Sequence, residues 1–352
     1  MQKQKIIFTQ DIENDLTNAL HRRPYDKLFI LTDESTLKAC ASRIKDFPCL
    51  QEANFITIPS GDLNKNITSL QSVWNALGEL MGTRKSLLIN LGGGMVTDLG
   101  GFAASTFKRG ITFINIPTTL LAMVDASVGG KTGINFNGLK NEIGVFNMAE
   151  SVIVDADFLQ TLDMPNLLSG YAEMLKHGLI SNTKHWAALL NFDWHEPDFR
   201  KLQHLIAESV RIKEAIVEED PYEYGIRKAL NFGHTIGHAF ESLSMETHHP
   251  LLHGYAVAFG LICELYFSFL KWGFPKDKLV QTVQFIKEHY GIYNIDCKQY
   301  DRLYELITHD KKNTDGIIYF TLLGEIGEIH INQPATQEEI CSVFDFFRDA
   351  GF

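Results

Sequence analysis

The sequence lacks several features that would assign it to a protein class at once. Its five cysteines are an odd number and form no CxxC pair. We therefore expect reduced thiols and a cytoplasmic location rather than a disulfide framework. There is no internal repeat and no low-complexity segment. Basic residues are also scarce, with 32 against 43 acidic ones, and the formal net charge of −11 argues against nucleic-acid and anionic-membrane partners.

A long uninterrupted apolar run is absent as well. The most apolar stretch, YAVAFGLICELYFSFLKWGF, contains Glu264, so we expect a buried helix there rather than a membrane span. The opening MQKQKIIFTQDIEN reaches acidic residues too early for a signal peptide. At 352 residues, of which 45% are hydrophobic, the chain is long enough for two folded domains.

Short apolar runs alternate with helical patterns in the first half of the chain. The runs are KLFILTD, NFITIPS, SLLINLGGG and GITFINIP, and ITSLQSVWNALGELMG is a helical stretch between them. This alternation predicts a parallel sheet covered by helices, which binds ligands at the carboxyl ends of its strands. The second half reads as successive helices with one late hairpin, GIIYFTLLGEIGEIHI. We predict an α/β domain over residues 1–157, a mostly helical domain over 158–352, and a ligand site between them.

A glycine-rich turn, LINLGGGMVTDLGGFAAS, follows one predicted strand and opens a helix. Residues 92–94 are all glycine, which lets the backbone approach a ligand closely. The start of the helix offers N–H groups to a phosphate or pyrophosphate. The spacing is not GxGxxG, however, so a tight turn with Asp98 near a helix start is the alternative interpretation.

A long polar segment follows the next predicted strand. It reads INIPTTLLAMVDASVGGKTGINFNGLKNEIG and carries Asp125, Lys131, Lys140 and Asn141. We expect an ordered functional loop here, because long loops in compact domains are usually functional. FKRG, just before it, adds Arg109.

Two histidines four positions apart, His234 and His238 in NFGHTIGHAFE, share one face of a predicted helix. His253 opens the next apolar helix, and Glu173 lies on an earlier amphipathic one with Lys176 one turn later. One carboxylate and two imidazoles from three helices would hold Zn²⁺ and leave positions open for substrate oxygens.

Spacing alone does not select the metal ligands. The chain has 13 histidines, and HxxxH without the glutamate of HExxH is a weak signal. THHPLLHG offers His248 and His249 as competing ligands. At this point the ligand set stays open, and core histidines remain an alternative.

Six segments occur together in one order: GGGMVTDLGGFAASTFKRG, IPTTLLAMVDASVGGKTGIN, LKNEIGVF, YAEMLKHG, LNFGHTIGHA and LLHGYAVAFG. In this combination the chain resembles the 3-dehydroquinate synthase family, a branch of the sugar phosphate cyclases, from about residue 60 to residue 325. The resemblance implies an N-terminal α/β domain with a Rossmann-like parallel sheet that binds NAD. A mostly α-helical C-terminal domain that binds metal would follow it.

The resemblance also implies a role for each residue that matches a family motif. The implied metal ligands are Glu173, His234 and His253, holding Zn²⁺ or Co²⁺. The implied NAD contacts are Asp62, Lys65, Gly93, Gly94, Asp98, Thr118, Thr119 and Lys140. The implied substrate-binding or catalytic residues are Arg109, Asp125, Lys131, Asn141, Lys176, Lys213, Arg227, Asn231 and His238, joined by either Lys311 or Lys312.

Three positions depart from the family pattern. Asp62 stands where the family usually has glutamate, Thr97 stands where glycine is common, and Met95 stands where valine is usual. A threonine with positive φ would be strained, so we expect Thr97 inside the first turn of a helix.

The reaction implied by the resemblance converts an anionic sugar phosphate, 3-deoxy-D-arabino-heptulosonate 7-phosphate, to 3-dehydroquinate and phosphate in aromatic amino acid biosynthesis by the shikimate pathway. Its steps are transient oxidation by NAD, β-elimination of phosphate, re-reduction and an intramolecular aldol closure. A homodimer is the implied assembly. The alternatives are a related cyclase of the 2-epi-5-epi-valiolone synthase type, a metal-dependent polyol dehydrogenase and a non-catalytic NAD- and metal-binding regulator.

Overall fold

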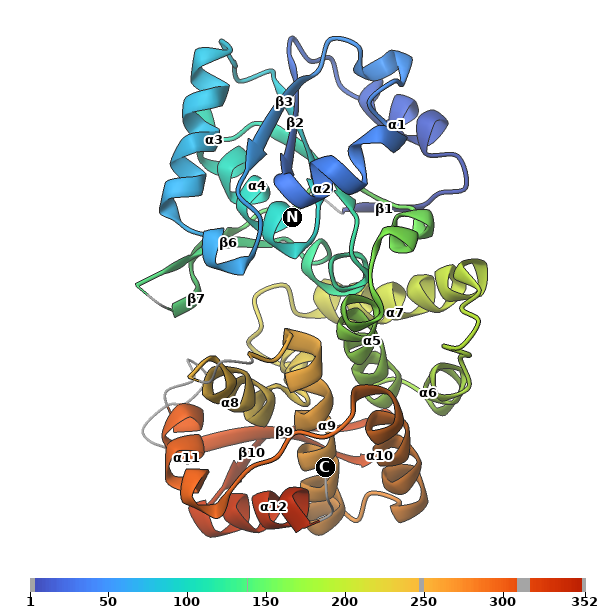
Figure 1. The fold of residues 1–352 in the computed structure, drawn as a ribbon, viewed down its shortest axis with the longest axis vertical. Helices are drawn as coiled ribbons and strands as arrows, with labels where there is room; N and C mark the ends of the chain where they lie inside the picture. Colours follow the sequence, from blue (N-terminus) through green and yellow to red (C-terminus); the bar gives the residue numbers. More distant parts are fainter. Residues whose placement is uncertain (1–3, 138, 247–249, 309–316, 350–352) are drawn as a thin grey trace. The chain divides into compact units, whose positions relative to one another are not determined.

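The computed structural model describes residues 4–137, 139–246, 250–308 and 317–349 (Figure 1). The chain forms two compact units. The first comprises Met1–Asp163 and Asp198–Val210, and the second comprises Met164–Pro197 and Arg211–Phe352. Helix α7 (Phe199–Glu219) is therefore divided between them at Val210.

The first unit is built on a six-stranded parallel sheet. Its strands are β1 (Lys5–Phe8), β2 (Leu28–Asp33), β3 (Asn54–Ile58), β4 (Leu87–Gly92), β5 (Thr112–Pro117) and β8 (Ser151–Val154), in the order β1-β8-β5-β4-β2-β3. Strands β2 and β4 are buried along their whole length, as expected for central parallel strands covered on both faces. The four strands predicted from the sequence are confirmed, while β1 and β8 were not predicted.

Helices cover both faces of the sheet. Their bounds are α1 (Ile12–Leu20), α2 (Glu34–Ala39), α3 (Ile67–Glu79) and α4 (Gly94–Thr106), with short helical turns at Ala41–Arg43, Pro48–Leu50, Asp62–Asn64, Phe107–Arg109 and Ala156–Thr161. In Figure 1, α1 and α2 lie on one side and α3 and α4 on the other. The chain therefore leaves the neighbouring strands β2 and β4 toward opposite faces. This is a topological switch point, where open α/β sheets bind ligands.

The prediction of a long loop after β5 is wrong. The segment folds instead into a one-turn π-helix (Ala122–Ala126) and an antiparallel hairpin of β6 (Lys131–Phe136) and β7 (Leu139–Phe146). Its glycines and polar residues obscured the strand pattern, because β7 is exposed along its whole length and has no buried face.

The second unit is mostly helical, as predicted. Its elements are α5 (Met164–Leu179), α6 (Thr183–Leu190), the last part of α7, a 3₁₀ turn (Ile226–Asn231), α8 (His234–Met245), α9 (His253–Trp272), α10 (Lys276–Tyr290), a second 3₁₀ turn (Cys297–Gln299), α11 (Tyr300–Thr308) and α12 (Gln337–Asp349). The late hairpin is confirmed as β9 (Ile318–Glu325) paired with β10 (Glu328–Ala335).

Helix α9 is the central element of the second unit and contacts α5, α8, α10, α12 and β9. It is the one described helix long and apolar enough to cross a membrane, but 72% of its apolar window is buried inside the unit. That burial is what the sequence predicted for a core helix containing Glu264. All five cysteines are free thiols.

Glycines let α9 approach its two neighbours closely. A Cβ at Gly254 would lie 1.8 Å from the carbonyl oxygen of Ser169 on α5. A Cβ at Gly260 would lie 2.0 Å from the carbonyl oxygen of Gly233, which precedes α8. No larger residue fits at either contact without moving a backbone, so these glycines set the spacing of the three helices.

Candidate active site

Three predicted metal ligands converge in the second unit. Glu173 of α5 is fully buried, and its Oε1 lies 3.2 Å from Nε2 of His234 and 3.4 Å from Nε2 of His253. The three donor atoms all lie within 4.8 Å of one another. Glu173 Oε1 nevertheless has no hydrogen bond of acceptable geometry. A buried carboxylate oxygen needs a partner, and a divalent cation among these three groups would provide one.

The electrostatics of these groups suit a cation. Burial alone would raise the pKa of Glu173, but the nearby charge of Lys176 and the contact with His234 hold it well below its usual range. Burial lowers the pKa of His234 to about 4, despite the opposing charge of Glu173. Glu173 is thus anionic and His234 neutral at neutral pH, which are the states that metal ligands require.

His253 has a different environment because two carboxylates contact it. Its Nδ1 lies 3.2 Å from Oε2 of Glu241, while its Nε2 faces Glu173. Burial alone would lower the pKa of His253, but the close contacts with the two carboxylates and their charges outweigh that effect and raise it to about 10. This imidazole is therefore protonated at neutral pH, and a divalent ion would have to replace the proton on Nε2. Zn²⁺ and Co²⁺ both suit nitrogen and oxygen donors of this kind.

His238 lies beside the three convergent groups. Its ring centroid is 5.3 Å from that of His234 and 6.0 Å from that of His253. His238 also belongs to a second potential ligand group with Glu241 and His253. Within the described residues of the second unit, the geometry alone therefore leaves two ways of placing a cation, and they share His253.

The predicted cations of the second unit are buried. Lys176, Lys213 and Arg227 are each 6% exposed or less. Lys176 Nζ bonds Oε2 of Glu173, the oxygen that faces away from the imidazoles. Nη1 of Arg227 donates to the carbonyl of Pro221 at 2.5 Å. A group of cationic side chains in one unit is compatible with an anionic ligand.

A turn organised by Asp220 leads into the 3₁₀ segment that holds Arg227 and Asn231. The Asp220 carboxylate accepts the backbone N–H groups of Tyr224 at 3.0 Å, Gly225 at 2.7 Å and Arg227 at 3.1 Å. The sequence analysis missed Asp220. Its signal was the Asp-Pro pair in EEDPYEYG, which is typical of turn initiation.

In the same segment, Asn231 donates its side-chain amide to Oε1 of Glu223 at 2.8 Å. Glu223 has a positive φ of 64°. The sequence did not single out Glu223 either, because nothing in its local pattern shows that the turn returns it to Asn231.

In the first unit, the glycine turn lies at the switch point, between β4 and α4. Gly93 caps α4 without any side-chain hydrogen bond. A Cβ at Gly93 would lie 3.1 Å from Cγ2 of Thr119, and one at Gly94 would lie 3.1 Å from Cβ of Ala126. Thr118 N–H donates to the carbonyl of Gly92 at 3.0 Å, so the glycine turn and the two threonines lie side by side. The N–H groups at this helix start suit a pyrophosphate.

Several more predicted cofactor residues meet near the start of α4. Lys65 is 5% exposed, and its Nζ contacts Oδ2 of Asp98 and Oδ1 of Asn141 at 2.5 Å each. Lys140 pairs with Asp62 at 3.4 Å. The fold thus gathers five predicted residues that are up to 79 positions apart in sequence, counted from Asp62 to Asn141.

Asp33 is a further candidate that the sequence analysis omitted. It ends β2, the neighbour of β4 at the switch point, and caps α2. Its Oδ1 accepts the N–H of Thr36 at 2.8 Å and the hydroxyl of Ser60 at 3.1 Å. The signal was present in KLFILTD, because an acidic residue at the carboxyl end of a parallel strand suits hydroxyl recognition.

Thr97 lies within α4, in its first turn, where its hydroxyl donates to the Gly94 carbonyl at 3.2 Å. It is absent from the residues with positive φ, so threonine is unstrained where the family commonly has glycine. The expected position of Thr97 is confirmed.

The other predicted residues are more scattered. Lys131 begins β6 and is exposed, and Asp125 lies in the π-helix at intermediate exposure. Arg109 follows the carboxyl end of α4 with a φ of 70°. A helix of 13 residues is about 20 Å long, so Arg109 is far from the glycine turn of its own chain. Lys311, Lys312, His248 and His249 lie outside the described residues.

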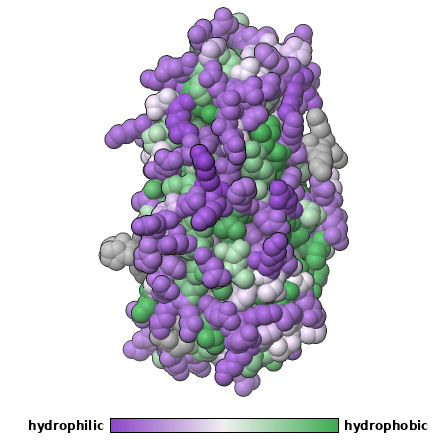
Figure 2. Space-filling view, turned by 90° about the vertical axis from the view of Figure 1, so that its right-hand side faces the viewer, coloured by the Kyte–Doolittle hydropathy of each residue, from purple (hydrophilic) through white to green (hydrophobic). Residues whose placement is uncertain are grey.

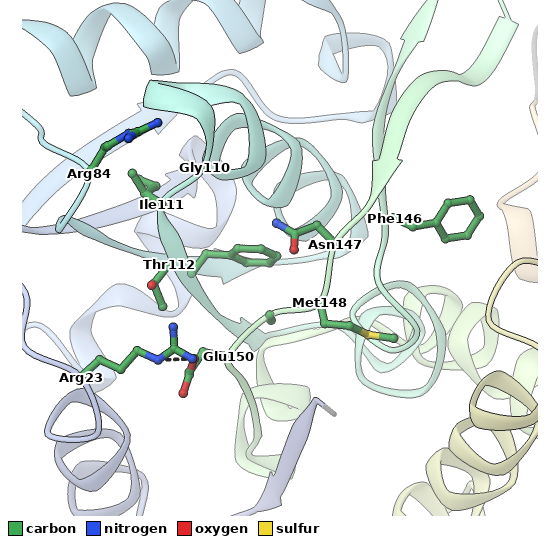
Figure 3. Close-up of a pocket in the computed structure, with 11 residues that line it drawn as sticks. Arg23, Arg84, Gly110, Ile111, Thr112, Phe146, Asn147, Met148 and Glu150 are labelled. Atoms are coloured by element: carbon green, nitrogen blue, oxygen red, sulfur yellow. Dashed lines mark ion pairs between the residues drawn. The ribbon is translucent and has the colours of Figure 1, made fainter. Parts of the chain in front are cut away.

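A cavity of about 300 Å³ opens at the amino end of β5, away from the glycine turn (Figure 3). Arg84, Thr112, Phe146 and the ion pair of Arg23 with Glu150, 3.1 Å long, help to line it. None of the predicted site residues lines this cavity, so its size does not make it the active site.

Comparisons with known proteins decide which family this architecture belongs to. The model for the 3-dehydroquinate synthase N-terminal domain matches residues 55–169, and the model for the 3-dehydroquinate synthase C-terminal domain matches residues 170–313. The chain belongs to the 3-dehydroquinate synthase family. The predicted family resemblance and fold class are confirmed.

Relatives match the chain over nearly its whole length. It is 55% identical over 350 residues to the 3-dehydroquinate synthase of Parabacteroides distasonis, covering 99% of each chain. It is 35% identical to the Streptococcus pyogenes serotype M3 enzyme of the same name, covering 92% of this chain and 90% of that one. The structure of 2-epi-5-epi-valiolone synthase from Streptomyces hygroscopicus, with NAD⁺ and Zn²⁺ bound, shares the fold at a TM-score of 0.86 and 22% identity, over 99% and 98% of the two chains.

Proposed function

We propose that this protein is a 3-dehydroquinate synthase. It converts 3-deoxy-D-arabino-heptulosonate 7-phosphate to 3-dehydroquinate and phosphate, a lyase reaction of the shikimate pathway and aromatic amino acid biosynthesis. The observation that carries the proposal is the convergence of Glu173, His234 and His253 in a chain that is 55% identical over its length to an enzyme of that name. The cytoplasm is the proposed location, in keeping with five free thiols.

The proposed cofactors are NAD and a divalent ion, Zn²⁺ or Co²⁺. NAD supplies a hydride acceptor that is reduced and reoxidised within one turnover, and the ion supplies a Lewis acid beside the substrate hydroxyls. Glu173, His234 and His253 would hold the ion. The start of α4 and the cluster of Asp62, Lys65, Gly93, Gly94, Asp98, Thr118, Thr119 and Lys140 would hold the nucleotide.

The cations of the chain bind the two anionic groups of the substrate. Lys131, Lys213 and Arg227 are assigned to the phosphate and carboxylate, with Arg109, Lys176, Asp125, Asn141 and Asn231 completing the site. Arginine can hold an oxyanion through two parallel hydrogen bonds. A local group of cations also explains how a chain of net charge −11 binds an anion, because the field at a site differs from the mean field.

His238 is assigned to proton movement on the phosphate side of the substrate. The support is its place beside His234, with ring planes at 89° to each other, and its partial exposure. An imidazole beside the substrate can act as a general acid and base.

The decisive experiment supplies the heptulosonate phosphate with catalytic NAD⁺ and follows phosphate and dehydroquinate. The proposal requires both products in equal amounts and no lasting absorbance from NADH. A polyol dehydrogenase would accumulate NADH in proportion to product. A 2-epi-5-epi-valiolone synthase would instead turn over a sugar phosphate that lacks the carboxylate. A non-catalytic regulator would release no phosphate.

A homodimer is part of the proposal. The β6–β7 hairpin exposes Phe136, Leu139, Ile143, Val145 and Phe146, which are 38–55% exposed. Elsewhere hydrophilic side chains cover most of the face shown in Figure 2. An apolar patch of this kind suits a second copy of the chain. In a dimer, Arg109 would contribute to the site of the second copy, because α4 holds it away from the glycine turn of its own chain.

A further inference from the structure

The two imidazoles of the candidate metal centre sit on helices that hold each other. His234 begins α8, and His253 begins α9. Each helix also carries a buried glutamate on the same face as its histidine. Glu241 follows His234 by seven residues, and Glu264 follows His253 by eleven, and both spacings return to the same face of a helix.

Glu241 contacts the imidazole of the other helix. Its carboxylate is 5% exposed, and Oε2 lies 3.2 Å from His253 Nδ1. A carboxylate there makes Nδ1 the donor and turns Nε2 toward Glu173. The tautomer and ring orientation of His253 are thus set from α8.

Glu264 acts on the start of α8 in return. The cap of α8 is Gly233, in a left-handed conformation with φ of 79° and no side chain to bond the first N–H groups. Glu264 is fully buried, and it accepts the N–H of Gly233 at 2.7 Å and of Ile236 at 3.1 Å. The two N–H groups lie on either side of His234 in the chain. Glu264 of α9 therefore fixes the backbone from which the His234 side chain projects.

We propose that Glu241 and Glu264 are positioning residues that form a reciprocal clasp, in which each helix orients the metal-binding imidazole of the other. The clasp rests on the proposed metal centre and concerns how its ligands are held. The close contact of Gly260 with the Gly233 carbonyl supports it, because this contact brings the two helices near enough for both carboxylates to reach.

The test compares Co²⁺ binding by wild-type apoenzyme with that of Glu241→Gln, Glu241→Ala and Glu264→Gln, by visible absorption and chelator competition. Loss of a group that orients a ligand typically costs roughly ten- to a hundredfold in metal affinity. We expect a loss of that size in Glu241→Ala. We also expect it in Glu264→Gln, because glutamine keeps only one of the two oxygens that accept the Gly233 and Ile236 N–H groups. Glu241→Gln should lose less, because one acceptor oxygen is enough for Nδ1 of His253. NAD⁺ affinity stays unchanged.

Glu246→Gln is the matched control. It lies at the end of α8, where the exposed Glu246 pairs with Arg302 at 2.7 Å, and its Co²⁺ affinity equals that of the wild type. Metal affinities of the Glu241 and Glu264 variants within twofold of this control would overturn the clasp. So would a Glu264→Gln enzyme whose apo melting temperature falls while its Co²⁺ affinity and spectrum stay unchanged.

Two further outcomes separate this inference from its premises. If Glu241→Ala and His238→Ala lose the ion while His234→Ala keeps it, Glu241 is a ligand and the clasp is wrong. If the wild type binds no ion, the proposed metal centre fails and the clasp fails with it. If the wild type and every Glu241 and Glu264 variant bind Co²⁺ equally well, only the clasp is refuted.

Discussion

At the scale of single residues, equivalent positions on one helix receive different environments. His234 and His238 are one turn apart on α8, yet only His234 has its Nε2 within 3.2 Å of Glu173. The difference comes from the neighbouring helices, because Glu173 of α5 reaches the imidazole at the start of α8 and Gly260 of α9 packs against Gly233 just before it. The role of each histidine therefore depends on its distance from the side chains of neighbouring helices and not on residue type alone.

The pair can be separated by metal analysis. We expect His234→Ala to lose the bound ion together with activity, because one of three ligands is removed. His238→Ala should keep a full equivalent of metal while turnover falls by roughly a hundredfold, the usual contribution of a general acid or base. Metal content by mass spectrometry and kcat by phosphate release are the measurements. The exposed His204 on α7 provides the control His204→Ala, and a metal-free His238→Ala would reverse the assignment.

Lys131 offers a test of substrate binding without a large effect on folding, because it is exposed at the start of β6. A charge-assisted hydrogen bond contributes roughly 1.5–3 kcal/mol, so Lys131→Met should raise the KM for the heptulosonate phosphate by about ten- to a hundredfold. The affinity for NAD⁺ should not change. Lys85→Met, at another exposed lysine, is the control, and an unchanged KM in Lys131→Met would remove Lys131 from the site.

At the scale of elements, the contact between α5 and α9 is as important as the ligands that it brings together. Ser169 and Glu173 lie one turn apart on α5, and Gly254 follows His253 directly on α9. The Gly254 N–H also donates to the Ser169 hydroxyl at 3.1 Å, so a hydrogen bond joins the two helices beside the backbone contact. Any change that separates the two backbones at this point also separates Glu173 from His253.

Gly254→Ala tests this contact. The added methyl would lie 1.8 Å from the Ser169 carbonyl oxygen, so the helices must shift, and overpacking of this kind costs roughly 1–3 kcal/mol. We expect a lower melting temperature and weaker Co²⁺ binding. Gly78→Ala, in the open on α3, should instead stabilise by about 0.5–1 kcal/mol through helix propensity. Calorimetry of both variants decides, and equal effects would contradict the packing argument.

The Asp220 turn has a pH signature. Burial by itself raises the pKa of Asp220, but the backbone N–H groups that its carboxylate accepts, those of Gly225, Tyr224 and Arg227 among them, together outweigh it and hold the pKa below the unfolded value of 3.8. A carboxylate with a lowered pKa adds stability that is present above the unfolded pKa and lost as the pH falls through the folded one. The urea midpoint of the wild type should therefore exceed that of Asp220→Ala above pH 3.8, and the gap should close below it. A gap that does not vary with pH would refute the ionic role.

At the scale of the whole molecule, the candidate catalytic groups are divided between two compact units. The nucleotide-binding candidates belong to the sheet unit and the candidate metal ligands to the helical unit, while α7 contributes to both. The predicted domain boundary after residue 157 stays a prediction, because the units interleave at α7. A reaction that needs hydride transfer beside a metal ion requires both units, so neither is expected to be active alone.

Arg109 leads to a prediction about assembly. Because α4 holds Arg109 about 20 Å from Gly94 of its own chain, we predict that Arg109 acts in the site of a second copy. Mixing inactive Arg109→Ala and inactive Glu173→Ala chains should then restore up to about a quarter of the wild-type activity, if subunits exchange at random and each hybrid has one intact site. Two variants both at Glu173 serve as the control. No recovery from mixtures that sedimentation shows to be heterodimers would assign Arg109 to its own chain or to no site.

The sequence by itself determined the parallel sheet, the glycine turn, the helical second half and the family, because apolar periodicity and long motifs are local properties of the chain. It also identified Glu173, His234 and His253 through family motifs. Only the tertiary structure decided which imidazole faces Glu173, that the polar segment after β5 is a hairpin, and that Asp33, Glu241 and Glu264 contact the candidate sites. Those facts depend on how elements pack together, which no local pattern shows. For the candidate metal ligands, the close packing of α9 at Gly254 and Gly260 brings residues far apart in the chain together.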